Sequence, residues 1–158
     1  MHRLESLCHK TRMDNRAIAN IFYETADLME VANEDPFRIR SYRRAAEAIE
    51  GQPNQIASII HDEKAVLAIP GIGKGMLLNL KELLGEGELK LHQQLLKKYQ
   101  PTMLELLKIS GLGPKTVSLI WDAFQVADIA GVEKLAREGK LRELPRMSAK
   151  TEEKIIKG

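Results

Sequence analysis

Two short glycine-containing segments carry the residues best suited to chemistry in this chain of 158 residues. Residues 67–75 have the sequence LAIPGIGKG, and residues 107–115 have the sequence LKISGLGPK. Each contains a Gly-apolar-Gly triplet, followed by a basic residue at the start of the next expected helix. Such a turn presents consecutive backbone N–H groups at a helix N-terminus, where the helix dipole is positive. The pattern therefore predicts two sites for anionic groups such as phosphates.

Each feature of these turns has a separate role. Glycine adopts positive φ without a steric penalty and lets another backbone approach closely. The middle apolar residue, Ile72 or Leu112, is expected to turn inward and fix the two helices against each other. Lys74 and Lys115 add a mobile positive charge. The candidate phosphate-binding residues are Gly71, Gly73, Lys74, Gly75, Gly111, Gly113, Lys115 and Thr116.

A glycine turn between helices can also be a tight corner without a ligand. Two copies with matching apolar and basic positions favour phosphate binding over this alternative. No strand pattern precedes either copy, which argues against a dinucleotide-binding fingerprint. A third, degenerate copy lies at residues 144–150, with Arg146 and Ser148 at the glycine positions. Because neither residue adopts positive φ cheaply, we interpret this copy as structural packing.

Composition limits the classes of protein to consider. The chain has 24 Lys and Arg against 22 Asp and Glu, a net charge of +2, so a nucleic-acid hypothesis must rest on local motifs. Cys8 is the only cysteine, which argues against a disulfide framework and a thiolate zinc site. The apolar runs are too short for a membrane span, and the first dozen residues do not resemble a signal peptide. We therefore expect a cytoplasmic, nucleoid-associated protein without a membrane partner.

The fold is expected to be all-α, with two small helical subdomains that each carry one glycine turn. Leu, Ile and Ala supply most of the apolar residues, which favours helices over strands. Asp14 or Asn15 is a candidate N-cap, and Asp35-Pro36 is a second helix start. The expected helices cover residues 15–32, 36–49, 56–60, 62–67, 74–84, 89–98, 101–108, 114–124, 132–138 and 149–157.

The densest basic cluster lies in the second expected helix. It contains Arg38, Arg40, Arg43 and Arg44, with Tyr42 among them. Arginine suits phosphate because its planar guanidinium donates paired hydrogen bonds. A solvated helix face is the alternative. The nearby glycine turn favours phosphate contact by Arg38, Arg40, Tyr42 and Arg43.

Three further features have a structural interpretation. Trp121 and Phe124 lie at core spacing after the second turn, so we expect packing and not a base-stacking platform. His92 is expected to face solvent. The acidic segment at residues 14–35 is interpreted as a solvated face, with a protein-docking surface as the alternative.

The two turns, residues 15–23 and the segment PFRIRSYRRAA at residues 36–46 together resemble the N-terminal region of bacterial family X DNA polymerases. The resemblance covers nearly the whole chain from residue 13. It implies a lyase-like helical domain at residues 13–98 and a second subdomain at residues 99–158. Residues 1–12 show no clear period and are expected to form a flexible tail.

In that family the turns are helix-hairpin-helix motifs. The first binds the downstream strand of gapped DNA, and the second binds the upstream strand. The resemblance also implies that the hairpins hold Na⁺ or K⁺ through backbone carbonyls, with no other cofactor required. The matching carbonyls belong to Leu67, Ile69, Ile72, Leu107, Ile109 and Leu112.

The chain departs from the family at its catalytic positions. No Asp-x-Asp pair for two-metal phosphoryl transfer occurs in the sequence, so polymerase activity is not expected. The lysine nucleophile of the family's lyase corresponds to Asn79, and a carboxamide cannot form a Schiff base. We therefore assign no catalytic residue, and Lys81 or Lys74 would supply the amine if the chain were a lyase.

The leading hypothesis is non-sequence-specific DNA binding through backbone phosphates, at gapped, nicked or branched DNA in repair. One alternative is a deoxyribose-phosphate or abasic-site lyase that uses Lys74 or Lys81. Another is an interaction module that binds a repair protein or a separate catalytic chain.

Overall fold

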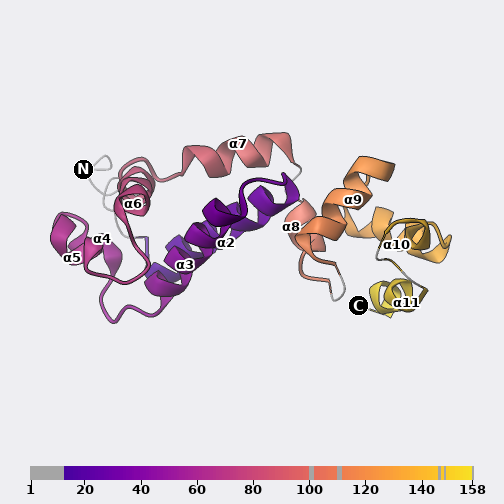
Figure 1. Cartoon of the computed structure of the whole chain (residues 1–158), viewed down its shortest axis with the longest axis horizontal. Coiled ribbons are helices and arrows are strands. Elements are labelled where there is room, and N and C mark those ends of the chain that lie inside the picture. The colour runs from indigo at the N-terminus through magenta and orange to yellow at the C-terminus, as the bar shows by residue number, and fades with distance from the viewer. Residues whose placement is uncertain (1–12, 100–101, 110–111, 146, 148, 158) are drawn as a thin grey trace, which may run out of the picture. The chain divides into compact units, whose positions relative to one another are not determined.

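A computed structural model describes residues 13–99, 102–109, 112–145, 147 and 149–157. All regular structure in these residues is helical, with no strand among them, so the predicted all-α class is confirmed (Figure 1). No helix in this described part is long and apolar enough to cross a membrane. The expected flexible tail at residues 1–12 and the glycine position Gly111 lie outside the described residues.

The chain forms two compact units. Unit 1 comprises Met1–Ala26 and Asp35–Leu95, and unit 2 comprises Asp27–Glu34 and Leu96–Gly158. Residues 27–34 therefore contribute to the second unit, although they precede most of the first unit in the sequence. No local sequence pattern indicates this contribution.

Unit 1 is built from the helices that surround the first glycine turn. They are α2 (Asn15–Val31), α3 (Pro36–Glu50), α4 (Ile56–Ile59), α5 (Glu63–Leu67), α6 (Lys74–Glu86) and α7 (Lys90–Lys98), of which the last turns of α2 and α7 belong to unit 2. Helix α5 packs against both α4 and α6, and α3 also packs against α6 (Figure 1). The first turn, between α5 and α6, is thereby backed by α3.

Polar caps explain where several of these helices begin. The Asp14 carboxylate accepts the Ala17 N–H at 2.8 Å, and the Asp35 carboxylate accepts the Phe37 N–H at 3.0 Å. Asp14 is therefore the N-cap of α2. Asn15 has a different role, because its buried amide accepts the Ile56 N–H at 2.8 Å and donates to the Asn54 carbonyl at 2.8 Å. That amide ties the start of α2 to the start of α4.

The core of unit 1 fixes the length of α6. The sequence predicted that this helix ends near residue 84, but Gly85 does not end it. The helix continues to Glu86 and ends at Gly87, whose φ is 82° and whose N–H donates to the Leu83 carbonyl at 2.8 Å. Leu83 and Leu84 are buried, and their packing outweighs the weak helix propensity of glycine.

His92 corrects another sequence expectation. Its side chain is only 9% exposed, and its Nε2 atom lies 3.1 Å from a carboxylate oxygen of Glu24. The residue therefore joins α7 to α2 and does not simply face solvent. A residue from α2, 68 positions earlier, makes this polar contact, which no periodicity within α7 could indicate.

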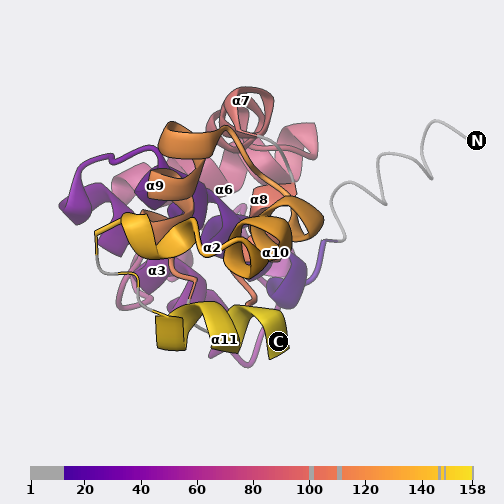
Figure 2. The ribbon, with the colours of Figure 1, turned by 90° about the vertical axis from the view of Figure 1, so that its right-hand side faces the viewer.

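Unit 2 surrounds the second glycine turn. Its elements are α8 (Thr102–Leu106), α9 (Pro114–Phe124), α10 (Ile129–Arg137), the 3-10 helix η1 (Leu141–Glu143) and α11 (Ala149–Lys157). Helices α10 and α11 pack against each other, and α10 also contacts α8 (Figure 2). The fully buried side chains of Met103, Leu106 and Ile120 form part of the core.

The degenerate third turn keeps part of the hairpin hydrogen bonding. The Leu144 N–H donates to the Leu141 carbonyl at 3.0 Å, and the Met147 N–H donates to the Leu144 carbonyl at 3.3 Å. The buried carboxylate of Glu152 accepts the Arg142 N–H at 2.6 Å and pairs with its guanidinium at 3.1 Å. These contacts tie η1 to α11. Arg146 and Ser148, which occupy the glycine positions, lie outside the described residues.

Candidate nucleic-acid interface

Three backbone hydrogen bonds shape the first turn. The Ile69 N–H donates to the Val66 carbonyl at 3.1 Å, and the Ile72 N–H donates to the Ile69 carbonyl at 3.1 Å. The third bond runs from the Leu77 N–H to the Gly73 carbonyl at 2.9 Å. Ile72 is 4% exposed and turns inward as predicted, and Ile69 is also buried, at 6% exposure.

The second turn repeats this register forty residues later. The Ile109 N–H donates to the Leu106 carbonyl and the Leu112 N–H to the Ile109 carbonyl, both at 3.1 Å. The Val117 N–H donates to the Gly113 carbonyl at 3.0 Å. Leu112 is 4% exposed. The two segments therefore have the same turn structure.

Gly71 is required by the fold of the first turn itself. Its φ is +100°, which strains any residue with a side chain. A Cβ atom at this position would also lie 3.3 Å from the Arg44 carbonyl oxygen and 3.4 Å from the Ala48 Cβ atom of α3. The expectation of positive φ therefore holds at Gly71.

The remaining described glycines of the turns have no such requirement. A Cβ atom at Gly73, Gly75 or Gly113 would meet no described atom within 4 Å. The φ angles of Gly73 and Gly113 are −97° and −95°, which any residue can adopt. The protein fold would therefore accept a side chain at these positions. The missing Cβ atoms leave open space at the N-termini of α6 and α9.

Both helix starts offer backbone donors to that space. Neither Gly73 nor Gly113 provides a side-chain cap, and the first hydrogen bond within each helix comes from Leu77 or Val117. Helix α6 therefore presents the N–H groups of its first three residues, 74–76. Helix α9 presents only those of residues 115 and 116, because Pro114 has no N–H. Lys74 and Lys115 are exposed beside these donors, and Thr116 is half-buried.

A polar cluster lies behind the first turn, between α3 and α6. The Asn79 amide donates to the Tyr42 hydroxyl at 3.2 Å. Burial raises the pKa of Tyr42 above its ordinary value, while Asn79 and the positive charge of Arg38 oppose this shift. The structure thus brings Arg38 and Tyr42, two of the predicted phosphate contacts, together with Asn79.

The other two candidate arginines have different neighbours. The Arg40 guanidinium lies over the Phe37 ring, 4.8 Å from its centroid, and Phe37 is 72% exposed. Arg43 lies near Tyr23, where its charge opposes the rise in the pKa of Tyr23 that burial causes. The four selected side chains therefore do not converge on a single point. Sequence reasoning did not select Phe37, although an apolar residue in the first turn of α3 was the available signal.

The two lysines considered for lyase chemistry lie in different surroundings from Asn79. Lys81 forms an ion pair with Glu63 of α5, whereas Asn79 contacts the Tyr42 hydroxyl of α3. Lys74 is exposed at the start of α6. Neither lysine takes the place of Asn79 against α3.

The carbonyl sets predicted for a monovalent cation lie in the two matched turns. The Ile69 and Ile109 carbonyls each accept one hydrogen bond of the turn, which leaves each oxygen a second lone pair. Outside the helices, no backbone N–H group of the described residues donates a hydrogen bond to the carbonyl of Leu67, Ile72 or Leu112. The described residues contain no cluster of His, Cys, Asp or Glu suited to a metal ion. The oxygen donors thus fit a hard, singly charged cation better than a transition metal.

Comparisons with known proteins agree with this arrangement. A family model described as "Helix-hairpin-helix domain" matches residues 13–89, and one described as "SAM-like Helix-hairpin-helix tandem" matches residues 103–158. The second range contains both the second turn and the degenerate third turn.

Three curated relatives share sequence with the chain. The DNA polymerase/3'-5' exonuclease PolX of Bacillus subtilis (strain 168) is 29% identical over 144 residues, which are 91% of this chain. The Holliday junction branch migration complex subunits RuvA of Acidovorax sp. (strain JS42) and Acidovorax ebreus (strain TPSY) are each 30% identical over 88 residues, or 56% of this chain. The chain spans 25% of the PolX relative and 46% of each RuvA relative.

The family models cover both turns, and the PolX match extends over nearly the whole chain. The two turns on which the resemblance partly rests also share one backbone hydrogen-bond register. The two matches thus assign helix-hairpin-helix domains to residues 13–89 and 103–158, and both fit the N-terminal region of the X-family DNA polymerases.

Proposed function

We propose that this chain binds DNA without sequence specificity, through backbone phosphates held at its two glycine turns, and that it acts at gapped or nicked DNA in repair. The observation that carries this proposal is the repeated turn, with the same hydrogen-bond register and open helix start in both units. Backbone N–H groups at a helix N-terminus bind phosphate and carry no information about bases.

A preference for gaps rests on the arginines of α3, the helix that packs against α6. Arg38 lies by Tyr42 and Asn79, and Arg40 lies on the exposed Phe37 ring. A 5′-phosphate at a gap has more negative charge than an internal phosphodiester, so paired guanidinium donors favour it. The Phe37 ring adds a face on which a base or sugar can pack.

Each turn also holds a monovalent cation in this proposal. The three carbonyls of each turn would supply the oxygen ligands, and the cation would add positive charge where phosphate binds. Replacing K⁺ with tetramethylammonium at constant ionic strength should weaken DNA binding, because that ion is too large for carbonyl ligation. Equal DNA affinity in the two salts would show that no bound cation contributes to DNA binding.

The test of the function is a binding series at two salt concentrations. The substrates are gapped duplex with and without a 5′-phosphate, nicked duplex, blunt duplex and single strand. We expect the tightest binding to the 5′-phosphorylated gap. We also expect the logarithm of affinity to fall with the logarithm of salt concentration, with a slope that corresponds to about four to six phosphates.

Two controls make this series decisive. Gapped substrates of equal length but different base sequence should bind within a few-fold of one another. Affinity that is insensitive to salt, or that varies by orders of magnitude with sequence, would contradict a grip on the backbone. Equal binding to gapped and blunt duplex would remove the gap preference and leave only general DNA binding.

A further inference from the structure

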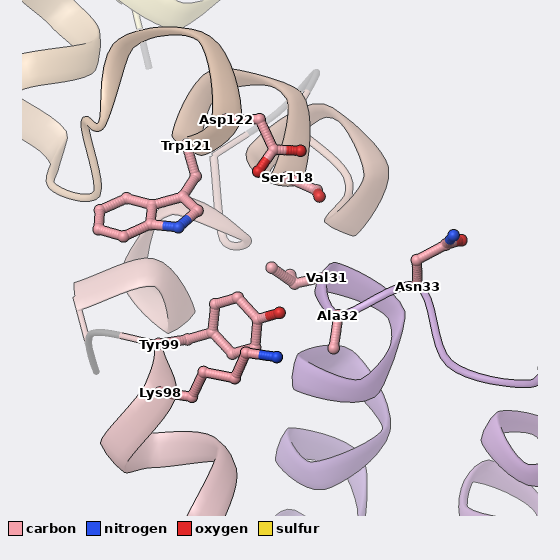
Figure 3. A pocket seen from close by; sticks show the side chains of 8 residues that line it. All are labelled: Val31, Ala32, Asn33, Lys98, Tyr99, Ser118, Trp121 and Asp122. Carbon is pink, nitrogen blue, oxygen red and sulfur yellow. The ribbon is translucent and has the colours of Figure 1, made fainter.

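Two adjoining hollows lie along α9 within unit 2. The aromatic hollow, of about 360 Å³, is lined by the end of α2, residues 98 and 99, and one face of α9 (Figure 3). The turn hollow, of about 420 Å³, includes Lys115 and Thr116 of the second turn. Asn33, Ser118 and Asp122 line both hollows. The aromatic hollow therefore continues from the place where the second turn presents its phosphate donors.

The chain holds the walls of the aromatic hollow in place. The end of α2 is closed by two bonds, from the Asn33 N–H to the Glu30 carbonyl at 3.1 Å and from the Glu34 N–H to the Met29 carbonyl at 2.9 Å. Asn33 takes the left-handed conformation, with φ 58°, that this type of helix end requires. Figure 3 shows the Tyr99 and Trp121 rings on one side of the hollow and Asn33 on the other.

Five side chains around the aromatic hollow have polar groups that are not engaged by the protein. Within the described part of the chain, no hydrogen bond or ion pair is made by the side chains of Asn33, Tyr99, Ser118, Trp121 and Asp122. Tyr99 is only 9% exposed as a whole, and its hydroxyl has no partner among the described residues. No fully buried side-chain nitrogen or oxygen of the described residues lacks a hydrogen-bond partner, so these five polar groups are accessible to a ligand that enters the hollow.

We propose that the aromatic hollow binds one unpaired nucleobase of the strand whose phosphate lies at the second turn. This inference rests on the proposed DNA binding and adds a subsite to it. The partly exposed Trp121 ring provides a surface on which any base can stack, and the largely buried Tyr99 ring lines the same hollow. The hollow's volume falls within the range of roughly 300–1,000 Å³ that is usual for small-ligand sites.

The spacing along α9 suits one strand in both hollows. Lys115, Ser118 and Asp122 follow one another at intervals of three and four residues and therefore share a helix face. Thr116 and Trp121 are five residues apart, or about 8 Å along the axis at about 1.5 Å per residue. A short stretch of extended strand can bridge that distance between a bound phosphate and a stacked base.

The charges indicate which part of the nucleotide enters. Asp122 lines both hollows, so we expect the phosphate at the Lys115 end of the turn hollow and the uncharged base in the aromatic hollow beside Trp121. A carboxylate accepts hydrogen bonds from the amino groups of adenine, cytosine and guanine, whereas thymine has no amino group. The Lys98 ammonium, 5.5 Å from the Tyr99 ring centroid, balances the charge of Asp122. We therefore expect unpaired adenine, cytosine or guanine to bind several-fold more tightly than thymine.

Trp121 is the only tryptophan of the chain, so its fluorescence reports directly on this subsite. The experiment titrates the protein with nicked duplexes that carry one extra, unpaired nucleotide at the nick. The unpaired position holds cytosine, thymine or an abasic residue, and the reference is the fully paired nicked duplex. The cytosine substrate should quench Trp121 and bind roughly five- to a hundredfold more tightly than the abasic one.

Variants on α9 separate stacking from folding. Trp121→Ala should remove the advantage of a base over an abasic residue, and Trp121→Phe should keep part of it. Asp122→Asn should remove the preference for cytosine over thymine. Phe124→Leu, an aromatic change on the same helix that does not line either hollow, is the matched control and should keep both preferences.

The outcomes distinguish this inference from the proposed function. Equal affinity for the base and abasic substrates, with no quenching of Trp121, would overturn the base subsite while leaving backbone binding intact. Absence of binding even to the fully paired nicked duplex would overturn the proposed function. A base preference that survives Trp121→Ala in a folded protein would place the subsite elsewhere.

Discussion

The two glycine turns have the same backbone hydrogen bonds but different neighbours. In unit 1, α6 presents three backbone donors, and Arg38 of the neighbouring α3 lies near Tyr42, which contacts Asn79 of α6. In unit 2, Pro114 leaves two donors, and the adjoining hollows bring aromatic and polar side chains to the same helix. In the proposed function, the repeated backbone turn supplies the phosphate contact common to both units. The neighbouring side chains then decide which feature of a strand each turn prefers.

The glycines within the first turn differ from one another in the same way. Gly71 is needed by the protein, because its φ is positive and α3 lies against it, whereas Gly73 is needed only by a ligand. Gly71→Ala should therefore lower the free energy of unfolding by about 1–3 kcal/mol. Gly73→Ala should leave it nearly unchanged. Urea denaturation measures both values, and equal stability of the two variants would contradict this distinction.

The guanidinium groups distinguish the first turn from the second. Replacing both Arg38 and Arg40 with Gln should lower the salt slope by about two. The variant should bind a 5′-phosphorylated gap at least about tenfold more weakly and lose its preference for the phosphate. The measurement is affinity for phosphorylated and unphosphorylated gaps at several salt concentrations.

A matched pair on α10 controls for total charge. Lys134 and Arg137 are exposed, and Arg137 is paired with Glu133 of the same helix at 2.8 Å. Their replacement by Gln removes the same two charges and should keep the preference for a 5′-phosphate. If both double variants behaved alike, net charge and not the Arg38 site would account for the preference.

The polar cluster behind the first turn provides a gain-of-function test. Imine formation needs a neutral primary amine aimed at the sugar, and Asn79 cannot provide one. We expect no borohydride-trapped adduct with abasic DNA above that of an unrelated basic protein. Asn79→Lys should raise trapping, because the new amine would lie near Arg38 and Tyr42.

Lysine variants identify the amine if trapping occurs in the wild type. Lys81 is paired with Glu63, and Lys74 lies at the start of α6. We therefore expect neither Lys81→Ala nor Lys74→Ala to change the level of borohydride trapping. Efficient trapping by the wild-type protein, abolished by Lys81→Ala or Lys74→Ala, would instead support the lyase hypothesis.

The smallest predicted effect concerns the missing donor of the second turn. Pro114→Ala restores a backbone N–H at the first position of α9. DNA should bind about two- to fivefold more tightly, since one net hydrogen bond is worth about 0.5–1.5 kcal/mol. The salt slope should not change, because no charge is added. Weaker binding by a stably folded variant would show that α9 does not present its donors to phosphate.

Local signals in the sequence were sufficient for the turns and for most helix starts. Asp35, Pro36 and the Gly-apolar-Gly triplets act on their immediate neighbours, so their effects can be predicted without knowing the fold. Trp121 shows the limit of this reasoning. Its spacing predicted a core position, but it lines a hollow formed with residues 31–33 and 98–99. The contribution of residues 27–34 to unit 2 depends on contacts between distant segments, which helical periodicity does not encode.

The central claim is that open helix starts at Gly73 and Gly113 grip the DNA backbone. The most direct test is DNA affinity of the double variant Gly73→Ala, Gly113→Ala, compared with Gly85→Ala, a glycine that also has no described atom within 4 Å of its would-be Cβ but lies inside α6. The double variant should bind gapped DNA at least about tenfold more weakly while its circular dichroism and unfolding free energy stay near wild type, because the added methyl groups occupy the space of the phosphates and not of the protein. Gly85→Ala should keep wild-type affinity and gain about 0.5–1 kcal/mol of stability. A folded double variant that binds gapped DNA as tightly as the wild type would contradict the account.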